Sequence, residues 1–192
     1  MNSLKGQFLV AMPGMGDERF HDTVVYLVGH GEEGAMGLVV NQSLEDMKFA
    51  DILEELKLGE HDEIIHLPSD VRERRVMRGG PVQRSRGFVL HSPDYFRQDN
   101  SYPVSDEVCL TATLDVLKAI AFKNAPADAL FALGYCGWSP GQLEGEIKMN
   151  GWLTVPFSRE LLFDAPIEDR YDEALGRLGI TRASLSGVAG NA

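Results

Sequence analysis

The chain has 192 residues, 44% of them hydrophobic, and a formal net charge of −11, so it can bury the core of one ordinary domain. This acidity argues against direct nucleic-acid binding, which depends on Lys and Arg neutralising phosphates. The N-terminus lacks the apolar run of a secretory signal, and no stretch approaches the roughly 20 apolar residues that span a bilayer. We therefore expect a cytoplasmic protein without a membrane partner.

The first forty residues have the composition of a sheet. Residues 6–12 form a strand pattern, and a loop rich in turn residues follows them. Two β-branched runs, at 23–30 and 36–42, are joined by the glycine-containing loop 31–35. This spacing predicts a β-hairpin.

The apolar period then changes from that of a strand to that of a helix. In "SLEDMKFADILEELKLG", residues 43–59, the leucines can share one helical face, with Ser43 as the cap and Gly59 as the end. We therefore expect one helix over 43–59. Residues 60–73 are typical of a polar link.

A second hairpin is predicted over residues 75–92, with its turn at Gly79, Gly80 and Pro81, because proline is poorly tolerated inside a central strand. The basic segment 72–86 overlaps it and holds six of the 18 Lys and Arg but only one acid. Two interpretations stay open. The arginines pair with neighbouring acids on a solvated hairpin, or they form an edge that binds a phosphate or carboxylate.

The second half of the chain alternates strands with helices. A polar loop over 92–106 suits the rim of a site, and the tail from about residue 184 is expected to fray. The remaining predicted elements are a strand at 107–112, a helix at 113–124 and strands at 129–135 and 152–157, followed by a helix at 167–179. Hairpins followed by alternating strands and helices predict a single α+β domain over residues 1–192.

"GWSPG", residues 137–141, fits the Gly-x-Ser-x-Gly pattern of serine hydrolases. The chemistry fails, because the residue after Ser139 is Pro140, which has no N–H to donate to an oxyanion. Every histidine also precedes Ser139, whereas that hydrolase fold places its histidine after the serine. We expect instead a helix start, with Ser139 as N-cap, Pro140 as first helical residue and Gln142 completing a capping box.

Other chemistry-bearing motifs are sparse. Cys109 and Cys136 lie in apolar runs, which predicts buried, unreactive thiols. The alternative for Cys136, near a predicted helix start, is a thiolate with a lowered pKa. The sequence has no HExxH motif and no pair of CxxC motifs that would indicate a metal site. Its glycine-rich stretches lack the Lys-Ser/Thr ending of a P-loop. We therefore expect no catalytic residues, no metal and no cofactor.

Three segments together carry a family resemblance: "GQFLVAMPGMGDERFHDTVVYLVGHGEEGAMGLVVNQ", "RGGPVQRSRGFVLHS" and "LGYCGWSPGQLEGEIKMNGWL". They resemble the YqgE/AlgH family of bacterial proteins. The resemblance implies a cytosolic single domain with a barrel-like, largely antiparallel sheet flanked by helices, and no established enzymatic activity. Some members carry the label of transcriptional regulator. Because this chain is acidic and has no recognisable helix-turn-helix, we expect a regulatory or binding protein that acts through a protein partner or a small anionic ligand.

Polar, glycine and aromatic residues inside these segments are the candidates for a ligand or partner surface. They are His30, Asn41, Arg78, Gly79, Gly80, His91, Trp138 and Gln142. The alternative for each polar residue is a buried group that satisfies loop backbone, and for Trp138 it is core packing. A second function class also stays open, namely an unrecognised enzyme for a phosphorylated or carboxylate metabolite, with a loop-built site near Arg78 and His91.

Overall fold

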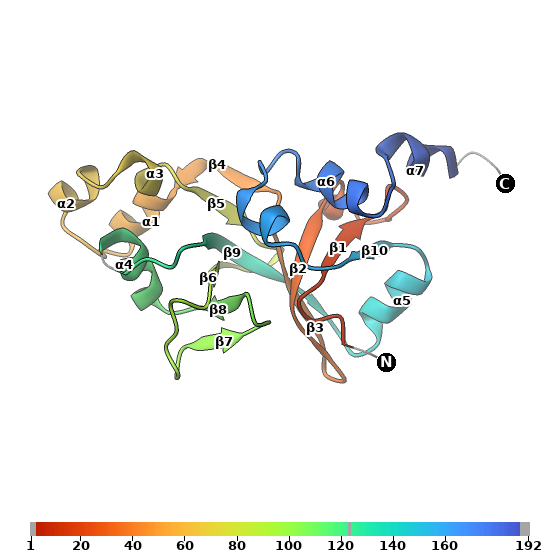
Figure 1. Ribbon diagram of the computed structural model, residues 1–192, viewed down its shortest axis with the longest axis horizontal. Coiled ribbons are helices and arrows are strands. Elements are labelled where there is room, and N and C mark those ends of the chain that lie inside the picture. Colours follow the sequence, from red (N-terminus) through yellow and green to blue (C-terminus); the bar gives the residue numbers. More distant parts are fainter. Residues whose placement is uncertain (1–2, 123, 189–192) are drawn as a thin grey trace.

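One curled, largely antiparallel sheet organises the computed structural model, which describes residues 3–122 and 124–188 (Figure 1). Its strands are β1 (Phe8–Ala11), β2 (Val24–Gly31), β3 (Gly34–Val39), β4 (Ser43–Lys48), β5 (Arg75–Arg78), β6 (Val82–His91), β7 (Ser101–Pro103), β8 (Cys109–Thr111), β9 (Ala129–Trp138) and β10 (Trp152–Val155). They are ordered β10-β1-β2-β3-β9-β6-β8-β7, and β5 pairs with both β4 and β9. The predicted α+β class and the barrel-like, largely antiparallel sheet are confirmed.

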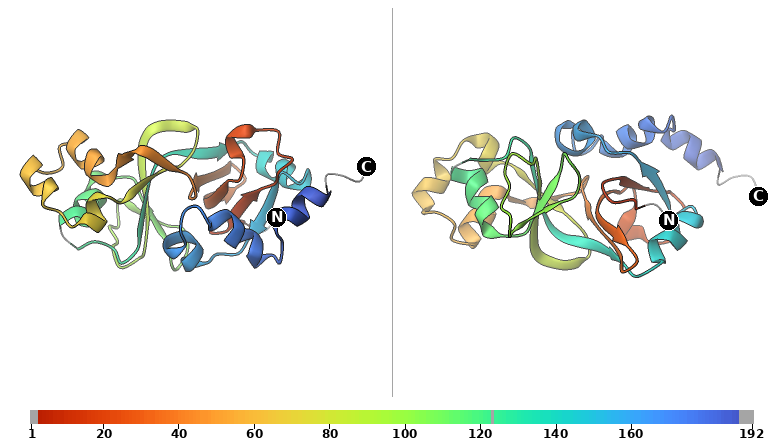
Figure 2. Two further views of the ribbon diagram at one scale, coloured as in Figure 1. Left: turned by 90° about the horizontal axis from the view of Figure 1, so that it is seen from above. Right: turned by 60° about the horizontal axis from the view of Figure 1, so that its bottom comes forward.

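The helices gather at the two ends of an elongated molecule. They are α1 (Phe49–Glu55), α2 (His61–Ile65), α3 (Ser69–Arg72), α4 (Leu114–Phe122), α5 (Gln142–Lys148), α6 (Arg170–Arg177) and α7 (Arg182–Val188). One end holds α1 to α4, and the other holds α5 to α7 beside β1, β2 and β10 (Figures 1 and 2). Two short turns complete the set, a 3₁₀ turn at Glu18–Phe20 and a π turn at Glu160–Asp164. Within the described ranges no helix is long and apolar enough to cross a membrane.

The β1–β2 half of the sheet is buried on both faces. Phe8 and Val10 belong to the core that Tyr171 of α6 completes. Leu9, on the opposite face, packs in a second cluster with Leu143 of α5. Burial on both faces explains why the first strands have continuous apolar sequences rather than an alternating pattern.

The other end has its own core. Phe49 of α1 and Leu117 of α4 pack against Val89 of β6 and Phe131 of β9. The rings of Phe49 and Phe131 meet edge to face, with centroids 6.2 Å apart. Each such fully buried side chain contributes about 1.5–3 kcal/mol of hydrophobic stabilisation. The helix expected at 113–124 is confirmed as α4, which buries Leu117 and Ile120, whereas Leu114 at its start is 49% exposed.

The single helix expected over residues 43–59 is wrong in its first third. Ser43–Lys48 forms β4, which pairs with β5, and α1 begins only at Phe49. The carboxylate of Asp51 accepts the N–H of Lys48 at 2.7 Å, so the helix start is marked by Asp51 and not by Ser43. Pairing at the sheet edge thus overrides the helical apolar period. The link expected at 60–73 also contains two short helices, α2 and α3.

The hairpin expected over 75–92 is also wrong. Phe131 of β9 pairs with Val76 of β5 and with Val89 of β6, so these two strands lie on opposite edges of β9. The chain therefore crosses β9 at Gly79 and Gly80. A Cβ on Gly80 would lie 2.1 Å from the carbonyl carbon of Tyr135, so only glycine fits this crossing.

Helix α5 begins two residues later than expected. Gly141, with φ +74°, is the N-cap, and Ser139 and Pro140 precede the helix. One half of the expected capping box exists, because the side-chain oxygen of Gln142 accepts the N–H of Ser139 at 3.0 Å. The tail expected to fray from residue 184 continues as α7 to Val188, and residues 189–192 lie outside the described ranges.

Candidate functional site

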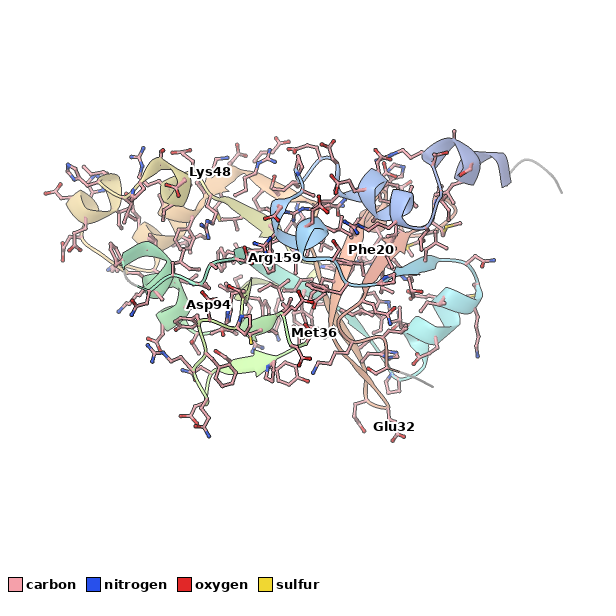
Figure 3. All side chains as sticks on the ribbon, viewed as in Figure 1. Phe20, Glu32, Met36, Lys48, Asp94 and Arg159 are labelled. Atoms are coloured by element: carbon pink, nitrogen blue, oxygen red, sulfur yellow. The ribbon has the colours of Figure 1, made fainter. Side chains whose placement is uncertain are left out.

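A cleft of about 580 Å³ opens between the loop that joins β1 to β2 and helix α5. The loop "PGMGDERF" at residues 13–20 forms one wall, and Figure 3 shows Phe20 at the end of the molecule that holds β1 and β2. Trp138 and Cys136 of β9 line the cleft from the sheet. Met149, directly after α5, is 77% exposed at its edge.

The cleft is aromatic on the side of the sheet. The indole rings of Trp138 and Trp152 meet edge to face at 5.9 Å, and the ring of Phe20 contacts Trp152 at 5.4 Å. One carboxylate oxygen of Glu146 accepts both indole N–H groups, at 2.9 Å and 2.7 Å. Its other oxygen accepts the amide N–H of Gln142 at 2.9 Å. These bonds fix the rings and occupy the carboxylate.

A smaller cavity of about 120 Å³ adjoins the cleft. Arg19, Phe20 and Pro81 line both spaces. The other residues around the smaller cavity are Val39, Gln42, Arg78, Gly80 and Arg84. Because the chain crosses β9 at Gly79 and Gly80, arginines from two different strands, β5 and β6, line one cavity.

Two of the three arginines at this cavity lack an acidic partner. Arg19 pairs with Asp17 at 2.5 Å, and its guanidinium holds the pKa of that carboxyl below the ordinary value. Arg78 and Arg84 are exposed, and neither forms an ion pair with any residue in the described ranges. By contrast Arg75, on the same strand as Arg78, pairs with Glu168. An acidic protein that leaves two neighbouring arginines unneutralised has a local positive field there.

Comparisons with known proteins identify the family of this chain. Residues 8–183 match the family described as AlgH-like. The chain belongs to this family. It is similar to the UPF0301 protein mlr7511 of Mesorhizobium japonicum, with 55% identity over 98% of this chain and 93% of that protein. A UPF0301 protein of Rhizobium meliloti is 50% identical over 98% of this chain and 93% of its own length.

Solved structures share the fold of this AlgH-like chain. The AlgH protein of Pseudomonas aeruginosa superposes with a TM-score of 0.79 and 41% identity, covering 100% of this chain and 95% of that one. Protein DIP2367 of Corynebacterium diphtheriae superposes with a TM-score of 0.70 at 19% identity, covering 92% and 87%, which shows the fold alone. The expected family is thereby confirmed.

The structure of this AlgH-like chain divides the eight predicted site residues into two groups. Arg78, Gly80, Trp138 and Gln142 line the cleft or the cavity that adjoins it. Gly79 is buried in the crossing, where its N–H donates to the carbonyl of Leu133. Half of the predicted set therefore comes together at one place.

The three remaining candidates make structural contacts elsewhere. His30 accepts the N–H of Leu4 and faces the carboxylate of Glu144 at 3.1 Å, linking the N-terminal segment to α5. Asn41 accepts the N–H of Val24 and donates to the carbonyl of Asp22, joining the ends of β2 and β3.

His91 lies at the opposite end of β6 from the crossing and is fully buried. Its Nδ1 is 2.9 Å from the carbonyl oxygen of Ser92, and its Nε2 is 2.8 Å from the hydroxyl of Thr111. Burial lowers the pKa of His91 below its ordinary value. The structure thus does not bring His91 together with Arg78.

Sequence reasoning missed several residues of the site. Arg19 and Phe20 come from the turn-rich loop, Gln42 from the end of the first hairpin, and Met149 from the end of α5. A signal for two of them exists, because a cation beside an aromatic residue in a glycine-rich loop is typical of a binding rim. Nothing in the local pattern at Gln42 or Met149 distinguishes them from surface residues.

Cys136 lines the cleft with a buried thiol. The side chain is 1% exposed, and burial raises the pKa of the thiol to about 12. Its sulfur lies 3.6 Å from the carbonyl oxygen of Gly79. The expectation of buried thiols is confirmed for both cysteines, and the alternative of a lowered pKa at Cys136 is wrong.

Proposed function

We propose that this protein is a non-catalytic binding protein that holds a small anion at Arg78 and Arg84 and transmits its bound state to a protein partner. The supporting observation is the pair of arginines that line a small cavity beside Gly80 and have no acidic partner among the residues that the structure describes. Guanidinium groups grip carboxylate and phosphate through paired, charge-assisted hydrogen bonds. Any influence on transcription is indirect in this proposal, because a chain of net charge −11 repels duplex DNA.

The size of the cavity supports a small anionic group. Its volume of about 120 Å³ leaves room for a few water molecules, at about 30 Å³ each, and hence for one carboxylate or phosphate. The amide side chain of Gln42 lines the same space and donates at present to Thr23. In this proposal the cavity takes one anionic group, and the rest of the ligand lies outside it.

The catalytic alternative has less support from the geometry. A reaction at Arg78 and His91 needs both side chains on one substrate, and His91 is buried at the far end of β6 with both ring nitrogens in hydrogen bonds. The regulatory proposal needs only binding, which the arginines around the cavity can supply. The cleft beside it offers room for the remainder of a ligand.

The test is a titration of inorganic phosphate and of acetate, followed by backbone amide NMR. We expect saturable shifts at Gly79 and Gly80 in the wild type. The Arg78→Gln variant should bind about two- to fivefold more weakly, because Arg78 is exposed and an exposed ion pair contributes up to about 1 kcal/mol. The matched control is Arg75→Gln, an exposed arginine on the same strand that pairs with Glu168 and should keep wild-type affinity. Absence of any response up to millimolar anion, or equal affinity in both variants, would refute the proposal.

A further inference from the structure

We propose that the anion is carried by a molecule with an uncharged aromatic ring, and that this ring occupies the larger cleft between residues 13–20 and α5. The ligand class is an aromatic molecule with one anionic group, such as an aryl carboxylate or an aryl monophosphate. This inference rests on the proposed function for its anionic end. It adds the chemistry of the remainder of the ligand.

The first argument is that the two spaces adjoin. Arg19, Phe20 and Pro81 line both, so the 120 Å³ cavity and the 580 Å³ cleft meet at these three side chains. The proposed ligand has its anionic group at Arg78 and extends past Phe20 into the cleft. The larger volume lies in the range of small-molecule sites, about 300–1,000 Å³.

The second argument is the apolar and aromatic lining of the cleft. Phe20 and Trp138 present rings, and Met15 and Met149 present thioethers, which make favourable contacts with aromatic groups. Met149 is 77% exposed, more than any other large hydrophobic side chain in the described ranges. A ring that enters the cleft removes part of this apolar surface from water.

The third argument concerns charge. The carboxylate of Glu146 already accepts three N–H groups, from Trp138, Trp152 and Gln142. The carboxylate of Asp17 is taken up by Arg19. Among the described residues that line it, the cleft therefore has negative charge and no free cation to match a second anionic group. A polyphosphate chain is disfavoured there, whereas a neutral ring meets no such repulsion.

The protein carries its own reporter for this ligand. Its two tryptophans, Trp138 and Trp152, are in mutual contact at the cleft, so a bound ring should change the intrinsic fluorescence. The probes are benzoate, phenylacetate and phenyl phosphate, each compared with acetate, inorganic phosphate and the uncharged benzyl alcohol. We expect at least one aryl anion to bind tenfold or more tightly than acetate or phosphate, because ring and anion act within one molecule.

Two variants separate the ends of the ligand. Met149→Gln changes an exposed side chain at the edge of the cleft, and we expect aryl anions to bind severalfold more weakly while inorganic phosphate is unaffected. Arg78→Gln should weaken both classes of probe. The control is the substitution Ile65→Gln, at an exposed apolar residue that ends α2 at the other end of the molecule, and it should change neither.

The outcomes distinguish this inference from the proposal on which it rests. If phosphate or acetate shifts Gly80 but no aryl anion binds more tightly or alters the fluorescence, the aromatic ligand is refuted and anion binding stands. If aryl anions bind equally well to Arg78→Gln, ring and anion do not share one site, and the inference is overturned. If no probe binds, both proposals fail.

Discussion

The two ends of strand β6 carry polar side chains in opposite physical situations. At the Val82 end, Arg78 and Arg84 are exposed around a cavity and have no acidic partner within the described ranges. At the His91 end, the imidazole is buried, and each ring nitrogen lies within hydrogen-bonding distance of a polar atom. Thr111, which contacts His91, is bonded in turn to Ser101 at 2.9 Å.

This difference shows which polar residues remain available to a ligand. A buried group whose hydrogen bonds are complete has nothing left to donate or accept, so it stabilises the fold. An exposed cation without a partner keeps its full capacity for a charge-assisted bond. Figure 3 shows the two regions in different parts of the molecule, with Phe20 beside β1 and Asp94, three residues after His91, near β8. The two ends of β6 therefore differ in whether their polar groups can bind a ligand, and not in residue type. We call the Val82 end the open end and the His91 end the closed end.

The largest expected effect comes from breaking the open end at its crossing. In Gly80→Ala the new methyl group would lie 2.1 Å from the backbone of Tyr135, which cannot move without disturbing β9. We expect the free energy of unfolding to fall by about 3 kcal/mol or more. Urea unfolding measures it, with Gly14→Ala as the control, because a Cβ there meets nothing within 4 Å. A loss below about 1 kcal/mol would show that the crossing tolerates a side chain.

The closed end, at His91, should make the free energy of unfolding depend on pH. Burial lowers the pKa of His91, so the unfolded chain takes up a proton below about pH 6.5 that the folded chain resists. The contribution of His91 to stability is therefore complete above that pH and is lost as the pH falls below it. We expect the loss of unfolding free energy between pH 7 and pH 5.5 to be smaller in His91→Gln than in the wild type. The exposed His61→Gln is the control, and identical slopes in all three proteins would contradict the prediction.

The smallest effect is on the stability of the arginine variants themselves. Arg75→Gln removes an exposed ion pair with Glu168 and should cost about 0–1 kcal/mol. Arg78→Gln removes no ion pair, so its stability should match the wild type within about 0.5 kcal/mol. Thermal and urea unfolding check both values. A larger loss at Arg78 would indicate a structural role and weaken the comparison between the two ends.

Part of the candidate site was accessible from the sequence. The basic segment 72–86 and the glycine pair at its centre drew attention to Arg78 and Gly80, and family-like segments drew attention to Trp138 and Gln142. Arg19 and Gln42 were missed, because they reach the cavity only through the fold. His91 was proposed together with Arg78 in a loop-built site, yet it is the last residue of the ten-residue strand β6 and lies at the end away from Arg78.

The sequence by itself determined the fold class, the family and the helices with a strong apolar face. In α6, for example, Tyr171, Ala174 and Leu175 recur at helical spacing and are all buried. A helix with one apolar stripe removes that stripe from water only when the stripe faces the core. Only the tertiary structure decided the partners of the ambiguous segments. Ser43–Lys48 became a strand because β5 offers it hydrogen bonds, and Gly79 and Gly80 became a crossing and not a turn because β9 lies between β5 and β6. Such non-local pairing is not encoded in local periodicity, and it is this pairing that brings Arg19, Arg78 and Arg84 to one cavity.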